Sequence, residues 1–160
     1  TCKADKGKTF ILFSDDLDKV LATFVLANGA VATGEKVTIF FTFWGLNAIK
    51  KLNKPAVKKD FFGKMFGMML PSSSLKLKLS KMSMGGIGGK MMRYIMNRKG
   101  IDSLESLRQQ ALENGVEFIA CQMSMDVMGV KQEELLDEVT IGGVATYMER
   151  ADNANINLFI

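Results

Sequence analysis

Apolar runs and amphipathic stretches alternate along the chain. An apolar run at residues 9–13 predicts a buried strand. The following stretch, 17–32, begins after Asp16, spreads apolar side chains over a wide helical face and ends before Gly34, so it predicts a helix. A second apolar run at 37–42 predicts the next strand.

The last third of the chain repeats this alternation. Residues 102–115 start at Asp102, carry Glu105 three residues later and end in a glycine, which predicts a capped helix leading into a strand that ends at Cys121. Further patterns predict a short helix at 131–136, a short strand at 139–141, a helix at 144–154 and a final strand at 157–160. Five strands with intervening helices imply one α/β domain over residues 1–160, with a parallel sheet covered by helices on both faces.

Residues 50–99 interrupt the alternation and form a basic insert. They hold thirteen Lys and Arg against one acid, Asp60, whereas the rest of the chain has eight basic and sixteen acidic residues. The insert is also rich in Phe, Met and Leu, and a glycine-rich joint at 85–89 precedes a short basic helix predicted at 90–98. The net charge of +4 therefore hides a strong asymmetry between insert and body.

The insert has several functional interpretations. A methionine-rich apolar face with a basic rim favours docking of an acidic partner protein or self-association. Contact with an anionic membrane surface is a less favoured interpretation. Nucleic-acid binding is not expected, because the aromatic residues cluster outside any known module pattern. No cofactor or metal is expected either: the methionine spacing is more typical of packing than of Cu(I) ligation, and residues 85–89 lack the lysine of a phosphate loop.

Length and cysteine content narrow the class of protein. The chain has 160 residues, enough for one domain with a sizeable core, and two cysteines, Cys2 and Cys121, which do not make a disulfide framework. No apolar stretch reaches the roughly 18 residues that a membrane span requires, and no signal peptide is expected. We therefore expect a cytoplasmic protein.

Candidate chemistry centres on Cys121. The carboxyl ends of parallel strands form the binding crevice of open α/β sheets, and a helical turn beginning at Met123 or Ser124 would favour the thiolate form. The chain has no histidine, which excludes a Cys-His dyad and suits sulfur transfer or thiol exchange better than hydrolysis. The alternative is a buried, inert cysteine packed like a small apolar residue.

Seven segments together carry a resemblance to a known family. They are FILFSDD (10–16), FTFWG (41–45), FFGKM (61–65), KLSKMSMGG (78–86), FIACQMSMDVMG (118–129), EELL (133–136) and IGGV (141–144). Together they resemble the DsrE/DsrF-like sulfur-relay family, in its DsrE-type branch with a basic insert. The resemblance implies a compact α/β fold with flavodoxin-like layering, homo-oligomeric assembly, and sulfane sulfur carried as a persulfide on Cys121. It also implies a rhodanese-like sulfur donor and a TusA-like carrier protein as partners.

The residues around the thiol form a candidate pocket at the same sheet edge. Ser14, Thr42 and Ser124 are candidate donors to bound sulfur, while Trp44 and Met123 are candidate walls that exclude water. Gly45 leaves the second strand at this edge, and Gly142 and Gly143 are expected to permit a tight strand-to-helix turn there. A helix cap at Ser14 and a core position for Trp44 are the competing interpretations.

The function that follows is a sulfur relay, with two alternatives left open. One is a non-catalytic module that binds a ligand or partner, in which Cys121 is incidental packing. The other is a thiol redox protein, although no resolving cysteine is evident unless Cys2 reaches the site. The sequence also leaves open whether the protein is a sulfurtransferase enzyme or a stoichiometric carrier.

Overall fold

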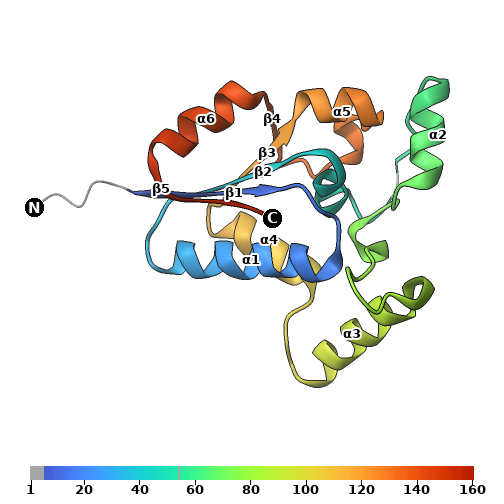
Figure 1. The fold of residues 1–160 in the computed structure, drawn as a ribbon, viewed down its shortest axis with the longest axis horizontal. Coiled ribbons are helices and arrows are strands. Elements are labelled where there is room, and N and C mark those ends of the chain that lie inside the picture. The colour runs from blue at the N-terminus through green and yellow to red at the C-terminus, as the bar shows by residue number, and fades with distance from the viewer. Residues whose placement is uncertain (1–5, 54) are drawn as a thin grey trace, which may run out of the picture.

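A single parallel sheet forms the centre of the molecule. The structure is a computed structural model that describes residues 6–53 and 55–160, so Cys2 lies outside the described residues. The strands are β1 (Gly7–Leu12), β2 (Val37–Phe41), β3 (Glu117–Cys121), β4 (Thr140–Gly142) and β5 (Ala154–Phe159). They lie in the order β4-β3-β2-β1-β5, and all four pairings are parallel (Figure 1). This confirms the predicted α/β fold with a five-stranded parallel sheet.

Helices cover both faces of the sheet. Helices α1 (Leu17–Ala32) and α4 (Leu104–Glu113) pack side by side on one face, and α5 (Gln122–Met128) and α6 (Val144–Asp152) lie on the other (Figure 1). The bounds of α1 agree with the predicted 17–32, because its buried residues recur at helical spacing. These are Leu17, Val20, Thr23, Phe24 and Ala27.

The core between the sheet and α1 contains three aromatic rings. Phe24 of α1 lies over Phe41 of β2 and Phe118 of β3, with centroid separations of 6.4 and 5.8 Å, and Phe41 and Phe118 are 5.1 Å apart. All three side chains are fully buried. Rings of this size bury large apolar areas, and their offset and tilted pairing adds to the stability from burial.

Element ends differ from the sequence predictions at several places. The cap of α4 is Ser103 instead of Asp102, because the Ser103 hydroxyl accepts a hydrogen bond from the Ser106 amide at 3.1 Å. The helix predicted at 131–136 is only a 3-10 turn, η4 (Gln132–Glu134). The helix predicted at 144–154 ends at Asp152, so that β5 begins at Ala154 and not at 157.

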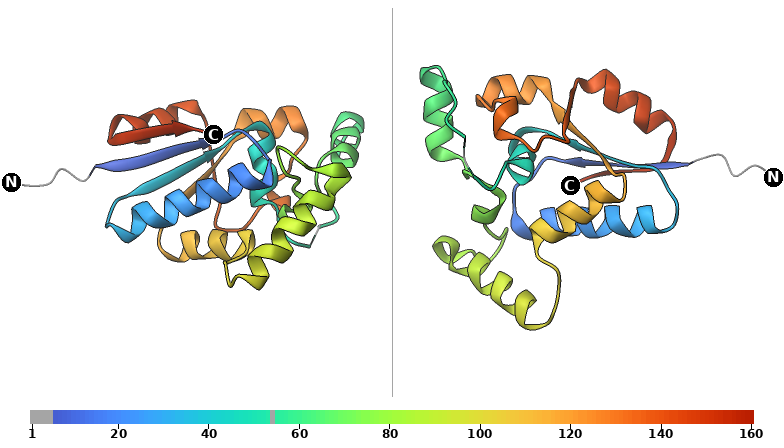
Figure 2. Two further views of the ribbon diagram at one scale, coloured as in Figure 1. Left: turned by 60° about the horizontal axis from the view of Figure 1, so that its bottom comes forward. Right: turned by 180° about the vertical axis from the view of Figure 1, so that it is seen from behind.

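The basic insert extends from one end of the molecule. Its helices α2 (Phe61–Met69) and α3 (Ile87–Arg98) both lie beyond the end of the strands opposite the N-terminus (Figures 1 and 2). Helix α3 starts at Ile87, earlier than the predicted residue 90, after Gly85 and Gly86 turn the chain at positive φ. Short 3-10 turns η2 (Ser74–Lys76) and η3 (Met84–Gly86) lie between the two helices. No helix among the described residues is long and apolar enough to cross a membrane.

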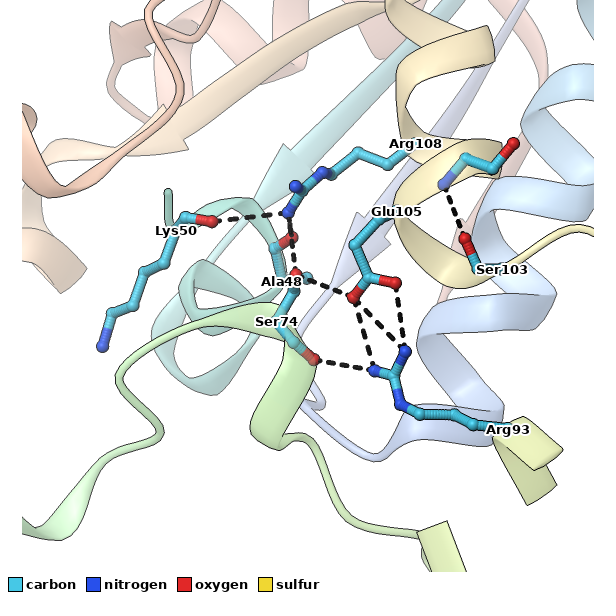
Figure 3. A network of polar contacts seen from close by, with 8 residues as sticks. Ala48, Lys50, Ser74, Arg93, Ser103, Glu105 and Arg108 are labelled. Carbon is cyan, nitrogen blue, oxygen red and sulfur yellow. Dashed lines mark hydrogen bonds and ion pairs between the residues drawn. The ribbon is translucent and has the colours of Figure 1, made fainter. Parts of the chain in front are cut away.

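A polar network on α4 holds the insert against the body of the molecule (Figure 3). Arg108 is buried and donates to the carbonyl oxygen of Ala48 at 2.8 Å and to the Ser74 hydroxyl at 3.1 Å. One turn earlier, Glu105 accepts hydrogen bonds from Arg93 of α3 at 3.0 Å and from Ser74 at 3.1 Å. Helix α4 therefore fixes both η2 and α3 through two charged side chains.

Candidate functional site

Cys121 lies at the carboxyl end of β3, at the predicted edge of the sheet. Its backbone pairs with Gly142 of β4, and its side chain is 2% exposed. The thiol belongs to a small apolar cluster with Phe40, Ile119 and Tyr147, on the face of the sheet that α6 covers. The side chain therefore packs against its neighbours in this conformation and does not face solvent, in contrast to the expectation of an open crevice.

The helix after Cys121 begins at Gln122, one or two residues before the predicted start at Met123 or Ser124. Cys121 is the N-cap of α5, with φ −71° and ψ 115°, and its side chain makes no capping hydrogen bond. The backbone amides of the first turn of a helix lack intrahelical acceptors, so they present partial positive charge near the cap residue. The Cys121 backbone therefore joins the end of β3 directly to the first turn of α5.

Two of the predicted hydroxyl donors lie together. Thr42, at the end of β2, and Ser124, in the first turn of α5, are both buried, and their hydroxyl oxygens are 2.8 Å apart. One hydroxyl donates to the other, so a second hydroxyl proton is available for another acceptor. This pair joins the end of β2 to the helix that follows Cys121.

The Ser14 hydroxyl makes its hydrogen bonds to a nearby residue of the chain, Asp16. The hydroxyl donates to the Asp16 carboxylate at 3.0 Å and accepts from the Asp16 amide at 3.1 Å. These bonds form the turn between β1 and α1, but the N-cap of α1 is Asp16, so Ser14 precedes the cap and is not the cap itself. Its proton is therefore not directed toward Cys121 in this conformation.

Trp44 and Met123 lie on the surface at this edge. Trp44 is 40% exposed in the 3-10 segment η1 (Phe43–Ile49), which follows β2, and Met123 is 55% exposed on α5. Neither is a fully buried core residue. Both have apolar surface available to a partner that approaches the edge of the sheet.

Three glycines shape the turns of this edge. A Cβ on Gly45 would lie 2.0 Å from the Leu12 carbonyl oxygen, so η1 can approach β1 only with glycine at this position. Gly142, which pairs with Cys121, also has little space for a side chain, since a Cβ there would lie 3.0 Å from a methyl carbon of Ile119. Gly143 is the exposed N-cap of α6 and has open space around it.

Sequence reasoning missed one polar pair close to this edge. The Asn47 amide donates to the Asp15 carboxylate at 3.0 Å, and Asn47 is completely buried in η1. Burial raises the pKa of the Asp15 carboxyl above its ordinary value of 3.8, although the hydrogen bond from Asn47 acts in the opposite direction. The side-chain amide oxygen of Asn47, Oδ1, has no hydrogen-bond partner among the described residues. A lone amide within an apolar segment has no spacing pattern that would identify it beforehand.

The described residues contain no group of three or more His, Cys, Asp or Glu side chains that could hold a metal ion. The reactive side chains that the structure places near this edge are the Cys121 thiol, the Thr42 and Ser124 hydroxyls and the Asp15 carboxyl.

Comparison with known proteins relates the chain to a family with this fold. The family model described as "DsrE/DsrF/DrsH-like family" matches residues 5–159. An uncharacterized protein of Bacillus subtilis, YrkE, is 45% identical over 155 residues, which cover 97% of each chain. The sulfur carrier protein DsrE2 of Allochromatium vinosum is 36% identical over 159 residues, covering 97% of this chain and 98% of that protein.

Solved structures agree on the fold at much lower sequence identity. The ychN protein of E. coli superimposes with a TM-score of 0.55 at 11% identity, covering 96% of this chain and 99% of that one. Protein MTH1491 of Methanobacterium thermoautotrophicum gives a TM-score of 0.54 at 14% identity, covering 98% and 100%. With the family model matching nearly the whole sequence, this chain belongs to the DsrE/DsrF/DrsH-like family.

Proposed function

We propose that the protein is a sulfur-relay protein that carries sulfane sulfur as a persulfide on Cys121. The observation that carries this proposal is the relationship to a sulfur carrier protein, 36% identical along almost the entire length of both chains. Membership of the DsrE/DsrF/DrsH-like family supports the same general role.

The position of Cys121 supports its assignment as the carrier. It is the one cysteine among the described residues, and it combines a strand end with the N-cap of α5. Thiol exchange uses the sulfur itself as the nucleophile, so it does not require the histidine that the chain lacks.

The proposed chemistry consists of two thiol exchange steps. The Cys121 thiolate attacks the outer sulfur of a donor persulfide, R–S–SH, forming a new S–S bond, while the old S–S bond breaks and the donor leaves as R–S⁻. In the second step an acceptor thiolate attacks the outer sulfur of the Cys121 persulfide, and the Cys121 thiolate leaves. One sulfur atom moves in each step, and neither step requires an external oxidant or reductant.

Access to the thiol is the structural condition of both steps. Because Cys121 is 2% exposed, a donor reaches its sulfur only when the residues that cover it move. The thiol packs against Tyr147 of α6, so a displacement of α6 would uncover it. The Thr42–Ser124 pair would then supply a hydroxyl donor to the incoming sulfur.

The proposed partners are a rhodanese-like sulfur donor and a TusA-like carrier protein, following the family resemblance.

We also propose that the protein is a homo-oligomer. Strand β5 is one of the two outer strands of the sheet, its Ile156, Leu158 and Phe159 side chains are exposed, and residues 154–160 contain no charged side chain. Edge strands without charge or proline are suited to pairing with another chain, and sedimentation analysis measures the assembly.

Intact-mass spectrometry after incubation with polysulfide tests the proposal. We expect the wild-type protein to gain one sulfur that dithiothreitol removes. The Cys121→Ala variant should gain none, and Cys2→Ala, which removes the other cysteine of the chain, should behave like wild type.

Other results would identify the alternative functions. A one-oxygen adduct or a disulfide would indicate a thiol redox protein. An unmodified wild-type protein, or a sulfur adduct that persists in Cys121→Ala, would contradict the carrier role and favour a non-catalytic binding module.

A further inference from the structure

The insert helix α2 points nearly all of its apolar side chains to the outside. Its exposed fractions are 76% for Phe61, 65% for Phe62, 88% for Met68 and 76% for Met69. Gly63 is the only buried residue of the helix. Large apolar side chains on a soluble domain are normally scattered singly, so a cluster on one protruding helix marks an interaction surface.

Helix α3 and the segment before it also expose apolar side chains. The large apolar side chains that are more than two-fifths exposed there are Met82, Met84, Ile87, Met91, Tyr94 and Ile95. In α3 they recur at a spacing of three to four residues and form a stripe along one side of the helix. Both helices lie at the same end of the molecule (Figures 1 and 2).

The charged groups of this surface are almost all positive. Exposed cations surround the apolar residues: Lys58, Lys64, Lys76, Lys78, Lys81, Lys90, Arg98 and Lys99. The one acid of the insert, Asp60, accepts a hydrogen bond from the Gly63 amide at 2.8 Å and caps α2. The surface therefore combines apolar side chains with positive charge and carries almost no negative charge.

Helix α2 is attached to the body of the protein at its base. Its Gly63 touches Gly129 at the end of α5, where a Cβ on Gly129 would lie 2.5 Å from the Gly63 Cα. Just before the helix, Lys59 forms a 2.7 Å ion pair with Glu134, and both side chains are at most 10% exposed. The outward direction of its apolar residues is thus set by packing at its base.

We propose that the outer surface of α2 and α3 binds the surface of an anionic phospholipid bilayer. Lysine supplies eleven of the thirteen cations of the insert. Lysine is depleted in protein interfaces, which favour arginine, whereas lysine with phenylalanine and methionine suits an anionic headgroup layer above acyl chains. The helices lie on the bilayer, since no described helix is long enough to cross it. This inference is independent of the chemistry at Cys121.

Vesicle flotation of the full-length protein tests the proposal. We expect the protein to float with vesicles that contain phosphatidylglycerol and not with pure phosphatidylcholine, and high salt should weaken binding because it screens the lysines. The variant Met68→Ser/Met69→Ser should bind about tenfold more weakly, since two buried apolar side chains are lost from the bilayer contact.

A matched variant separates this surface from general hydrophobicity. Val144→Ser/Met148→Ser removes two apolar side chains on α6, each 53% exposed, and should leave vesicle binding unchanged. Absence of flotation with anionic vesicles, or an equal loss in both variants, would overturn the proposal. It would also be overturned if the α2 variant changed only the sedimentation of the free protein, because the surface would then bind a second copy of the chain.

Discussion

At the scale of single residues, the burial of Cys121 determines how the proposed relay works. The thiol is held at a strand end beside first-turn amides, yet Phe40, Ile119 and Tyr147 enclose it. Enclosure protects a persulfide from water and small thiols between transfers. It also makes each transfer depend on local opening.

Alkylation measures this opening. In a Cys2→Ala background, we expect iodoacetamide to modify Cys121 at least about tenfold more slowly in the native protein than in denaturant, because only the opened conformation exposes the thiol. Following the reaction by mass spectrometry at several reagent concentrations gives the rate. Equal rates in native and denatured protein would contradict the enclosed thiol.

Gly45 offers a second prediction at this scale. Gly45→Ala should reduce the free energy of unfolding by about 2–4 kcal/mol, because its Cβ would lie 2.0 Å from the Leu12 carbonyl oxygen and force η1 away from β1. Urea unfolding measures the change.

Gly29 provides the matched control for this substitution. It lies within α1 and a Cβ there meets nothing within 4 Å, so Gly29→Ala should stabilise the protein by about 0.5–1 kcal/mol. If both variants unfold at the same urea concentration, the close approach at Gly45 is not a structural constraint.

At the scale of elements, α4 connects the insert to the body. Burial alone would raise the pKa of Glu105, but hydrogen bonds from Arg93 and Ser74 outweigh it, and the pKa is lowered from its ordinary value of 4.5. A lowered folded-state pKa stabilises the protein above the unfolded-state pKa. That contribution is lost as the pH falls through the folded-state pKa.

Glu105→Gln tests this connection. At neutral pH we expect it to lower the free energy of unfolding by about 1–2 kcal/mol, since the ionised partner of Arg93 is lost. The difference from wild type should shrink as the pH falls below 4.5 and Glu105 of the wild type becomes protonated. Denaturant unfolding across this pH range measures it, with Glu113→Gln on the exposed end of α4 as the control. A difference that does not change with pH would rule out the ion pair as the cause.

The sequence predicts the helices and strands more accurately than it predicts the contacts between side chains. Periodicity identified α1 to the residue and all five strands, because apolar spacing reports directly on burial against a sheet. Helix ends were less certain: Asp102 and Ser103 are both good capping residues, and only the hydrogen bond to Ser106 selects Ser103. The burial of Cys121 and the Asp15–Asn47 pair depend on how α6 and η1 pack, and local sequence carries no signal for that packing.

At the scale of the whole molecule, the proposed chemistry and the exposed insert lie near one another. Parallel strands bring Cys121 to their carboxyl ends, and α2 contacts the C-terminal end of α5 through Gly63 and Gly129. The same α5 begins at Gln122, directly after its N-cap Cys121. A surface that binds a bilayer through α2 therefore acts close to the helix that follows the thiol.

The central claim is that Cys121 both accepts and releases sulfur, and a chase experiment tests it most directly. The persulfidated protein is freed of donor, mixed with a TusA-like carrier protein, and both proteins are followed by intact mass. We predict that one sulfur leaves this chain and appears on a cysteine of the carrier, with no transfer from a Cys121→Ala sample treated in the same way. Sulfur that stays on Cys121 until a reductant is added would contradict a relay.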